Sequence, residues 1–515
     1  MTQPARRPGP LAAGDPFGAA RATGGPPRRY LILAVCCMSL LIVGLDNTIV
    51  NVALPSIRSD LHTSVSGLQW TVDAYTLVLA SLLMLSGSTA DRVGRKLTFQ
   101  VGLVLFSLGS FLCGVAPSVG ALVAFRIVQA VGGSMLNPVA MSIITNTFTD
   151  RRERAQAIGV WGAVVGLSMA LGPVVGGALV TSAGWRFIFW INVPIGLLAC
   201  ALTARFVPES RAPRARRFDP VAQALLVVIL ASVTFGIIEG PRHGYSSPLI
   251  LGTFAAAGVA LAVFVPYERR RLEPLIDLRF FGSAPFSGAT VVAVAAFAAL
   301  GGFLFMNTLY LQESRGLSAL GAGLDTLPMA GMTVLLAPVS GMVVGRRGAR
   351  PSLVVAGLFL TASALVLTQV SRTTPFAWLF VAYALFGIGF GVVNAPITNT
   401  AVSGMPDSQA GVAAAVASTS RQVGQTIGVA VLGALATAGL HGSLASGLPA
   451  ATHAGWWIIV GCGVTVLTVG LLTTTRWATA TAERVASLLR DAPDPARPEG
   501  RPRVGPPRPA RSGPG

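Results

Sequence analysis

Charged residues are scarce in this chain: they make up 11% of its 515 residues, while hydrophobic residues make up 52%. A typical soluble domain has about a quarter of its residues charged, so this composition excludes an ordinary soluble protein. Cysteine and histidine are also rare, with five and four residues. All five cysteines fall in apolar stretches without metal-ligand spacing to a histidine. The sequence therefore predicts buried thiols and no metal site.

What the chain does contain is a series of fourteen apolar stretches, most of them about twenty residues long. That length matches the roughly 30 Å hydrocarbon core of a bilayer at a helical rise of about 1.5 Å per residue. We therefore predict an all-α polytopic membrane protein with fourteen transmembrane helices. The predicted spans are 31–54, 69–88, 97–115, 119–143, 157–181, 187–205, 221–239, 249–267, 285–310, 322–344, 352–369, 377–399, 412–436 and 456–475.

The basic residues are unevenly distributed along the chain. Of the 38 Lys and Arg residues, 31 lie in the two tails and in alternate loops, five lie in the opposite loops, and Arg126 and Arg421 lie within spans. Cytoplasmic loops carry an excess of Lys and Arg, so we expect a multi-pass protein of the cell membrane with both termini cytoplasmic. The net charge of +18 is then a topology signal, and no nucleic-acid partner is predicted.

Three segments of the first half recur, in the same order, in the second half. Residues 123–138 align without gaps on 381–396, residues 87–96 align on 341–350, and residues 159–176 match 411–428 at their ends. These repeats predict two six-helix bundles in parallel repeat with two extra helices between them. One large class of secondary transporters has this layout.

The repeat divides the chain into five predicted regions. A disordered cytoplasmic N-tail (1–29) precedes the N-terminal six-helix bundle (30–205). Two inserted transmembrane helices with basic cytoplasmic loops (206–283) lead to the C-terminal six-helix bundle (284–475). The Pro- and Arg-rich C-tail (476–515) is predicted to be disordered and cytoplasmic.

Ionisable side chains inside spans are the first candidates for function, because they are costly there. Asp46 lies about sixteen residues beyond Tyr30, which is roughly 24 Å along a helix, and Arg126 reaches a similar depth from the other side. We expect the two side chains to face one central cavity, where Asp46 exchanges protons as Arg126 and desolvation favour opposite charge states. A buried ion pair that only fixes helix packing is the alternative.

Asp73, near the outer end of the second span, is a further candidate for proton coupling, with a solvated carboxylate as the alternative. A solvated carboxylate is also predicted for Glu239 at an outer helix end. Other polar side chains within spans are candidates for the lining of a substrate cavity. These are Asn51, Gln129, Asn307, Arg421, Gln422 and Gln425.

The short loop between the second and third spans combines glycines with charges of both signs. Gly87 and Gly94 permit a tight turn, Asp91 is placed to cap a neighbouring helix, and Arg92 and Arg95 are placed to reach across. Such a cluster predicts a cytoplasmic gating loop that latches one conformation. A plain basic loop would not need the aspartate and glycines at these spacings.

The fifth span carries glycines at spacings of four and five residues and a proline. Glycines at i and i+4 let two helix backbones approach closely, and a proline bends a helix. The pattern predicts a hinge or a sealed helix–helix interface, with a generic packing motif as the alternative. The residues are Gly162, Gly166, Gly172, Pro173, Gly176 and Gly177.

Together these segments resemble the major facilitator superfamily, and within it the fourteen-span drug:proton antiporters (the EmrB/QacA type). The resemblance covers about residues 30–475. Residues 45–55 are similar to the first-helix signature of that group, 87–96 to the superfamily loop motif, and 162–177 to the fifth-helix antiporter motif. Residues 126–132 look like the fourth-helix motif, with Ala130 where Gly is usual.

The resemblance implies proton exchange involving Asp46 and Arg126, latching by Asp91 and Arg92, and leak-tight closure by Gly172 and Pro173. In the second loop Gly345 replaces the aspartate, which suggests that latching differs between the halves.

We therefore expect a proton-driven exporter of hydrophobic or cationic drugs that works by alternating access. It would function as a monomer, with substrates, protons and the lipid bilayer as its partners and with no cofactor. An exporter dedicated to one natural product remains open, as does a non-transporting sensor with a transporter fold. A polytopic membrane enzyme is disfavoured because the loops are short and lack acidic or metal-binding clusters.

Overall fold

The computed structural model describes residues 26–211, 218–271, 273–439 and 444–491. The described chain is almost entirely helical, as apolar segments in a bilayer must be, because a helix satisfies its own backbone hydrogen bonds. The long helices are α1 (Pro26–Leu61), α2 (Val65–Val93), α3 (Arg95–Gly114), α4 (Val119–Thr147), α5 (Arg151–Ser182), α7 (Asn192–Phe206), α8 (Pro220–His243), α9 (Pro248–Arg270), α10 (Ala284–Leu309), α12 (Leu327–Arg347), α13 (Arg350–Leu367), α14 (Phe376–Val402), α15 (Asp407–Ala438), α16 (Leu444–Thr473) and α17 (Arg476–Asp491). The shorter elements are α6 (Phe187–Trp190), η1 (Leu278–Gly282), η2 (Tyr310–Ser314) and α11 (Ala319–Asp325).

Within the described residues, 12 helical segments are long and apolar enough to cross a membrane, and the bent α5 makes a thirteenth. The remaining predicted span corresponds to α15, which forms a helix of 32 residues. It is less apolar than the other spans because polar side chains run through its middle, at residues 418–422 and 425–426. The predicted all-α polytopic fold is confirmed.

The predicted boundaries need three corrections. The tenth span is split at Thr326, between α11 and α12, whereas α6 and α7 together form the sixth span, Phe187–Phe206, as predicted. Helix α1 begins at Pro26, inside the predicted disordered tail; proline suits a first helical turn, where its missing N–H is not needed. Helix α17 lies inside the C-tail predicted to be disordered, because its buried face of Ala478, Ala482 and Val485 packs on the chain near η1 and α10. The rest of both predicted tails lies outside the described residues.

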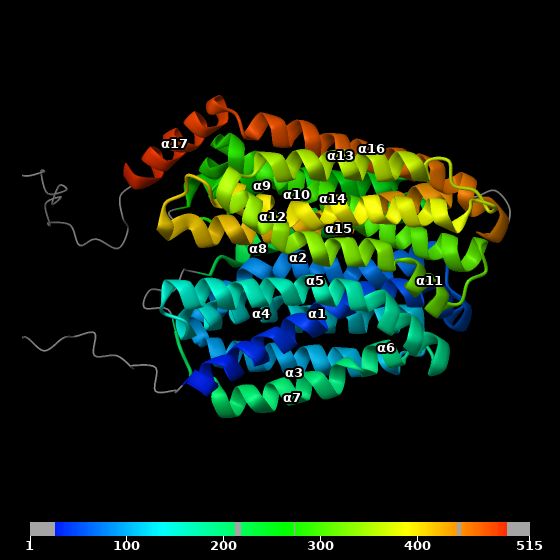
Figure 1. Cartoon of the computed structure of the whole chain (residues 1–515), viewed down its shortest axis with the longest axis horizontal. Helices are drawn as coiled ribbons and strands as arrows, with labels where there is room; N and C mark the ends of the chain where they lie inside the picture. The colour runs from blue at the N-terminus through cyan, green and yellow to red at the C-terminus, as the bar shows by residue number, and fades with distance from the viewer. Residues whose placement is uncertain (1–25, 212–217, 272, 440–443, 492–515) are drawn as a thin grey trace, which may run out of the picture.

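The helices form two bundles side by side, α1–α7 and α10–α16 (Figure 1). The chain enters the first bundle and leaves the second at the same end, which we call the tail end; the opposite end is the far end. Helix α8 packs against both α2 and α15, and α9 packs against α8, so the inserted pair lies beside the contact between the two bundles.

Contacts between the bundles are concentrated at the far end. A Cβ atom on Gly177 of α5 would lie 2.6 Å from the carbonyl oxygen of Ala319, at the start of α11. The Arg58 guanidinium pairs with Glu313 at 3.4 Å, and the Gln312 amide donates to the Val52 carbonyl at 2.8 Å. The short π-helical turn η2 at the end of α10 carries both Gln312 and Glu313, and π-turns often mark functional positions.

The tail halves of the two bundles have separated on the side of α5 and α12. A Cβ atom on Gly159 or Gly162 of α5 would meet nothing within 4 Å, and the same holds for Gly341 and Gly345 of α12. The molecule is therefore closed between α5 and α11 at the far end and open between α5 and α12 at the tail end.

Candidate functional site

Asp46 of α1 and Arg126 of α4 form a buried ion pair inside the N-terminal bundle. The Arg126 Nη1 donates to Asp46 Oδ2 at 2.5 Å, and the two side chains are 1% and 0% exposed. Gln129 Nε2 and Asn192 Nδ2 donate to the other oxygen, Asp46 Oδ1, at 2.8 and 3.1 Å. The pair is thus fully enclosed by donors and by neighbouring helices.

The same network fixes the guanidinium of Arg126 in place. Its Nε donates to the Thr71 carbonyl at 3.1 Å, and its Nη1 also donates to Gln129 Oε1 at 2.8 Å. The guanidinium carbon, Cζ, lies 4.1 Å from the centre of the Tyr75 ring. The interaction between Asp46 and Arg126 is as expected from the sequence, but the expected opening to a central cavity is wrong. Helices α1, α2, α4 and α7 surround both side chains and exclude water from them. A buried ion pair is tolerated where protein groups replace the hydrogen bonds to water, as Gln129, Asn192 and the Thr71 carbonyl do here.

Asp73 of α2 is in a different environment from Asp46. Its side chain is 0% exposed, and neither carboxylate oxygen has a hydrogen-bond partner within the described residues. The alternative given for Asp73, a solvated carboxylate, is therefore wrong. Gln69 and Thr76, about one turn away on either side of Asp73, both bond to α15: the Gln69 amide donates to the Ala430 carbonyl at 2.9 Å, and the Thr76 and Thr426 hydroxyls are 2.8 Å apart. Asp73 thus lies along the contact between the two bundles.

The predicted cavity residues occupy four separate places. Gln129 belongs to the Asp46 network, while Asn307 accepts from the Tyr383 hydroxyl at 2.5 Å inside the C-terminal bundle. Asn51 is buried and donates to the carbonyl of Asn47 in its own helix at 3.2 Å. Asn307 and Asn51 are thus held within the helical packing, and the structure does not bring these residues together.

The fourth place is the middle of α15. The Gln425 amide exchanges hydrogen bonds with Asn47 of α1 at 3.1 and 3.2 Å, which links the two bundles. One turn towards the tail end, Arg421 bonds to the hydroxyls of Thr398 and Ser418, and none of the ion pairs in the described part of the chain includes it. Gln422 beside it has an unpartnered buried oxygen. Arg421 is thus a cation without a carboxylate partner at membrane depth.

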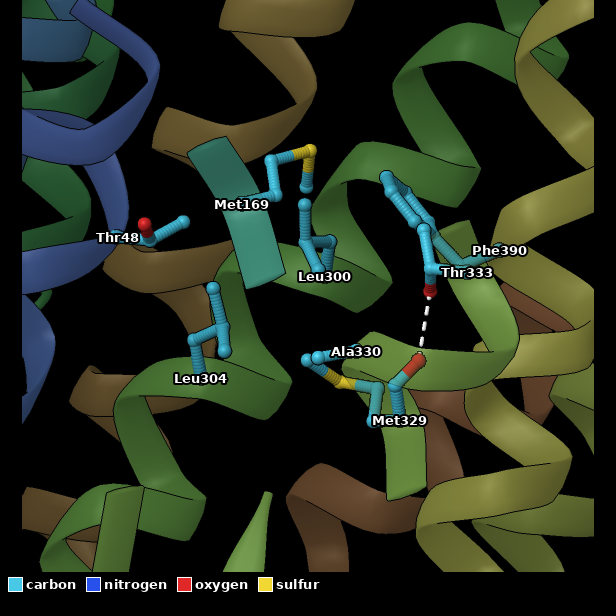
Figure 2. A pocket seen from close by; sticks show the side chains of 8 residues that line it. All are labelled: Thr48, Met169, Leu300, Leu304, Met329, Ala330, Thr333 and Phe390. Carbon is cyan, nitrogen blue, oxygen red and sulfur yellow. Dashed lines mark hydrogen bonds between the residues drawn. The ribbon is translucent and has the colours of Figure 1, made fainter. Parts of the chain in front are cut away.

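A small pocket lies between the bundles, behind α5 and α12 (Figure 2). Its lining is largely apolar and contains two methionines and a phenylalanine. Thr333 turns its hydroxyl away to the Met329 carbonyl at 2.9 Å. The lining residues are Thr48, Met169, Leu300, Leu304, Met329, Ala330, Thr333 and Phe390. None of the predicted polar cavity residues belongs to this set.

The predicted gating loop differs from expectation in two respects. Gly87 lies within α2, where a Cβ atom would make an ordinary 3.8 Å contact with Pro138, so only Gly94, at φ +132°, provides the turn. Asp91 does not cap a neighbouring helix but pairs with Arg95 of the same loop at 2.8 Å, while Arg92 is exposed. Because this pair is local and partly exposed, it contributes little to stability.

The residue that caps α3 was missed by sequence reasoning. Glu209 accepts the backbone N–H groups of Lys96 and Leu97 at 3.1 and 3.2 Å. A carboxylate at a helix N-terminus satisfies free donors and the helix dipole. Glu209 lies in a loop more than a hundred residues further along, so no local pattern could have indicated it.

The glycine-rich fifth span divides into two functional parts. A Cβ atom would lie 2.6 Å from the Ile49 side chain on Gly176 and 2.6 Å from the Ala319 carbonyl oxygen on Gly177, and it would be closer still to Thr48 on Gly172. Gly162 faces open space, however, and Gly166 only approaches Val334 at 3.9 Å. The expected close helix contact thus exists from Gly172 onwards, and α5 is bent by 40° between Met169 and Leu171, just before Pro173.

Glu239 at the far end of α8 is buried, although the sequence suggested a solvated carboxylate. It is 8% exposed and accepts from the Trp70 indole N–H at 2.9 Å. At the other end of α8, Asp219 caps the helix by accepting from Ala222 at 3.0 Å, and it bonds to Tyr267 and Arg271 of the α9 end. Partial burial acts to raise the pKa of the Asp219 carboxyl, but these hydrogen bonds and the charge of Arg271 lower it below its usual value.

No group of three or more His, Cys, Asp or Glu side chains in the described ranges is arranged to hold a metal ion. The site instead consists of one paired and one unpaired buried acid, an unpaired cation and an apolar pocket between two helical bundles. These features, in a fold of two repeated six-helix bundles, define a polytopic membrane transporter.

The comparison with protein families identifies the class. The sequence profile of the Major Facilitator Superfamily matches residues 36–429, and the chain belongs to this superfamily. It is 36% identical over 416 residues to the multidrug resistance protein Stp of Mycobacterium tuberculosis, which covers 81% of this chain and 77% of Stp. It is 38% identical over 425 residues to the tetracenomycin C resistance and export protein of Streptomyces glaucescens, with 82% and 79% covered. The multidrug efflux pump LfrA of Mycolicibacterium smegmatis is 34% identical over 422 residues, with 82% and 83% covered.

Solved structures show the same fold at low sequence identity. A bacterial homolog of the human lysosomal transporter Spinster, crystallised inward-facing and occupied, aligns with a TM-score of 0.63 at 16% identity over 90% of this chain and 98% of its own. A D-xylose–proton symporter aligns with a TM-score of 0.62 at 16% identity over 87% and 97%. The protein is thus a transporter of the Major Facilitator Superfamily and not an enzyme.

Proposed function

We propose that the protein is a proton-coupled antiporter that exports hydrophobic drugs, cationic ones included, from the cell by alternating access. Three relatives at 34–38% identity are named for drug resistance or efflux, and the apolar pocket suits such compounds. The tail end, which carries most of the Arg-rich segments, is cytoplasmic. The conformation described here is then open to the inside and closed to the outside, and the chain works as a monomer.

The observation that carries the proton coupling is the unpaired carboxyl of Asp73 between the two bundles. An ionised carboxylate without a partner is strongly destabilised at this depth, so Asp73 holds a proton in this conformation. Separating α2 from α15 would expose it to water and let the proton leave. A bundle movement of this kind is what alternating access requires.

Asp46 and Arg126 form the second part of the proposed proton pathway. Asp46 accepts hydrogen bonds from Arg126, Gln129 and Asn192, which enclose its carboxylate in this conformation. Proton exchange at Asp46 therefore requires a conformation in which Arg126 has moved away. A purely structural ion pair remains the alternative for these two residues.

The test is substrate-driven proton release from energised inverted vesicles. Wild-type protein should release protons when lipophilic dyes or antibiotics are added, and Asp73→Asn and Asp46→Asn should lose this release. Glu239→Gln is the matched control, because it changes a buried acid at the edge of the bundle and should leave the release intact. Full proton-coupled export by Asp73→Asn would contradict the proposal.

An exporter dedicated to one natural product is the second candidate. It is favoured by the relative named for resistance to, and export of, a single compound, tetracenomycin C. A broad response to the panel of dyes and antibiotics supports a multidrug pump, and a response to one compound supports the dedicated exporter.

A further inference from the structure

We propose that Arg421 forms a subsite for the anionic group of acidic hydrophobic compounds, whose apolar part occupies the pocket between the two bundles. This inference rests on the proposed export function and adds a class of substrate to it, organic acids with an apolar body. The charge of Arg421 then decides which of the compounds that fit the pocket are bound well.

Arg421 lies on the side of α15 that faces the space between the bundles. Gly424 turns a second side of α15 to α10, since a Cβ atom there would lie 2.4 Å from an α10 carbonyl oxygen. Thr426 turns a third side to α2, where it bonds to a threonine hydroxyl at 2.8 Å. Arg421 bonds instead to α14, and Gln425, about one turn further along, bonds to α1. Helices α1 and α14 both line the pocket, so Arg421 faces the same space.

The internal repeat supports this orientation independently. In the alignment of residues 159–176 on 411–428, Arg421 occupies the position that Met169 holds in α5. Met169 lines the pocket, as Figure 2 shows. Helices related by such a repeat turn equivalent sides to the contact between the two halves. The C-terminal bundle therefore places a cation where the N-terminal bundle places a methionine.

The guanidinium lies within reach of a compound bound in the pocket. Gln425 bonds to Asn47, which directly precedes the lining residue Thr48. Arg421 is about one helical turn, or roughly 5 Å, from Gln425 towards the tail end. An aromatic body in the pocket can thus extend a charged substituent to Arg421.

The contacts of Arg421 leave it able to bind an anionic group. Its guanidinium donates to the hydroxyls of Thr398 and Ser418, and its Nε has no partner among the described residues. A guanidinium has five N–H donors and binds a carboxylate through two parallel hydrogen bonds. Because the side chain is half-buried, a ligand between the bundles can reach it. The two hydroxyls hold the guanidinium in place without neutralising its charge.

The balance of charge at this depth favours an anionic ligand. Asp46 and Arg126 neutralise each other, and Asp73 carries a proton in this conformation under the proposed function. None of the ion pairs in the described part of the chain includes Arg421. A cation without a partner is costly inside a membrane. An anionic ligand removes this cost by pairing with Arg421, whereas a cationic ligand is repelled.

The test is the binding of three naphthalene compounds to the purified full-length protein in phosphatidylcholine nanodiscs. Naphthoate, naphthamide and naphthylmethylammonium share an apolar body and differ in charge. Equilibrium dialysis, with protein-free nanodiscs as the blank, gives the dissociation constant of each. The variants are Arg421→Gln and Arg421→Lys. Arg347→Gln is the matched control, because it removes an exposed arginine at the end of α12 whose charge is screened by salt.

We expect the wild type and Arg347→Gln to bind naphthoate about tenfold more tightly than naphthamide. Arg421→Gln should lose this preference, and Arg421→Lys should keep part of it, because lysine retains the charge but not the paired donors. Arg421→Gln should also gain affinity for naphthylmethylammonium, which an unfolded variant could not do. Equal binding of naphthoate and naphthamide by the wild type, or an unchanged preference in Arg421→Gln, would overturn the subsite.

This measurement is separate from the test of the proposed function, because no transport is involved. A preference for naphthoate that depends on Arg421, together with no proton release in the vesicle assay, would contradict proton-coupled export and leave the subsite standing. Loss of the preference alone, with proton release intact, would overturn the subsite and leave the export function standing.

The headgroup of an anionic lipid offers the same charge as an organic acid. Nanodiscs that also contain phosphatidylglycerol distinguish the two sources. Naphthoate binding as tight as in phosphatidylcholine alone would support an exported acid as the ligand of Arg421. Loss of naphthoate binding there would show that the lipid phosphate takes the site, and would overturn the exported acid as its ligand.

Discussion

Replacing Arg126 with leucine should destabilise the protein more than any other single change in the N-terminal bundle. The guanidinium makes the 2.5 Å bond to Asp46 and further bonds to Gln129 and the Thr71 carbonyl. Removing one partner of a buried pair costs about 3–5 kcal/mol, because the other charge stays buried without compensation. The lost bonds to Thr71 and Gln129 place Arg126→Leu at the upper end, about 5 kcal/mol.

The double variant Asp46→Leu/Arg126→Leu separates the charge effect from the loss of packing. It leaves no buried charge, so the combined loss should be smaller than the sum of the single losses by about 3 kcal/mol. The assay is equilibrium unfolding of the purified protein in mixed micelles, followed by loss of helix signal. Losses that simply add would refute the assignment of a tightly coupled ion pair.

Three further predictions concern the gate, the cation and the helix cap. Gly177→Leu should prevent closure between α5 and α11, because even a Cβ atom would lie 2.6 Å from the Ala319 carbonyl oxygen. Labelling of a cysteine placed at the buried Ala319 should then increase, and unchanged labelling would contradict the tight contact. Arg421→Gln should strengthen binding of cationic dyes about tenfold and leave neutral ones unchanged, because it removes a buried positive charge that repels a cation. Two unit charges at a separation of about 10 Å and an effective dielectric constant of about 20 repel by roughly 1.7 kcal/mol. Equal effects on both dye classes would contradict an electrostatic role. Glu209→Ala should lower the free energy of unfolding by about 1 kcal/mol and speed hydrogen exchange at the amides of Lys96 and Leu97. Asp91→Asn should change this stability little, because the ion pair of Asp91 is partly exposed. A larger loss of stability in Asp91→Asn than in Glu209→Ala would contradict the capping role of Glu209.

The fold could be predicted largely from the sequence, because apolar length and the placement of arginine depend only on the bilayer. The contact of Asp46 with Arg126 could also be predicted, since depth along two antiparallel helices is simple arithmetic. The sequence could not show whether that pair faces a cavity. Gln129 and Asn192, which enclose the pair, come from helices whose rotation no local pattern fixes. For the same reason the unpaired burial of Asp73 and the isolation of Arg421 became evident only in the structure.

Two other features depended on long-range packing. Helix α17 was hidden in a tail rich in Pro and Arg, although its own residues 476–491 contain no proline. The different roles of Gly162 and Gly177 on one helix depend on where α11 and α12 lie, and glycine spacing alone does not specify this.

The most direct test of the account is proton release on substrate binding to the purified protein in weakly buffered detergent solution. Coupling at Asp73 predicts that binding of a cationic dye releases protons from the wild type, and that Asp73→Asn still binds dye but releases none. Asp46→Asn and wild type measured side by side show whether the enclosed ion pair takes part in the same step. Undiminished proton release from Asp73→Asn would contradict the central claim that this unpaired carboxyl holds the exchanged proton.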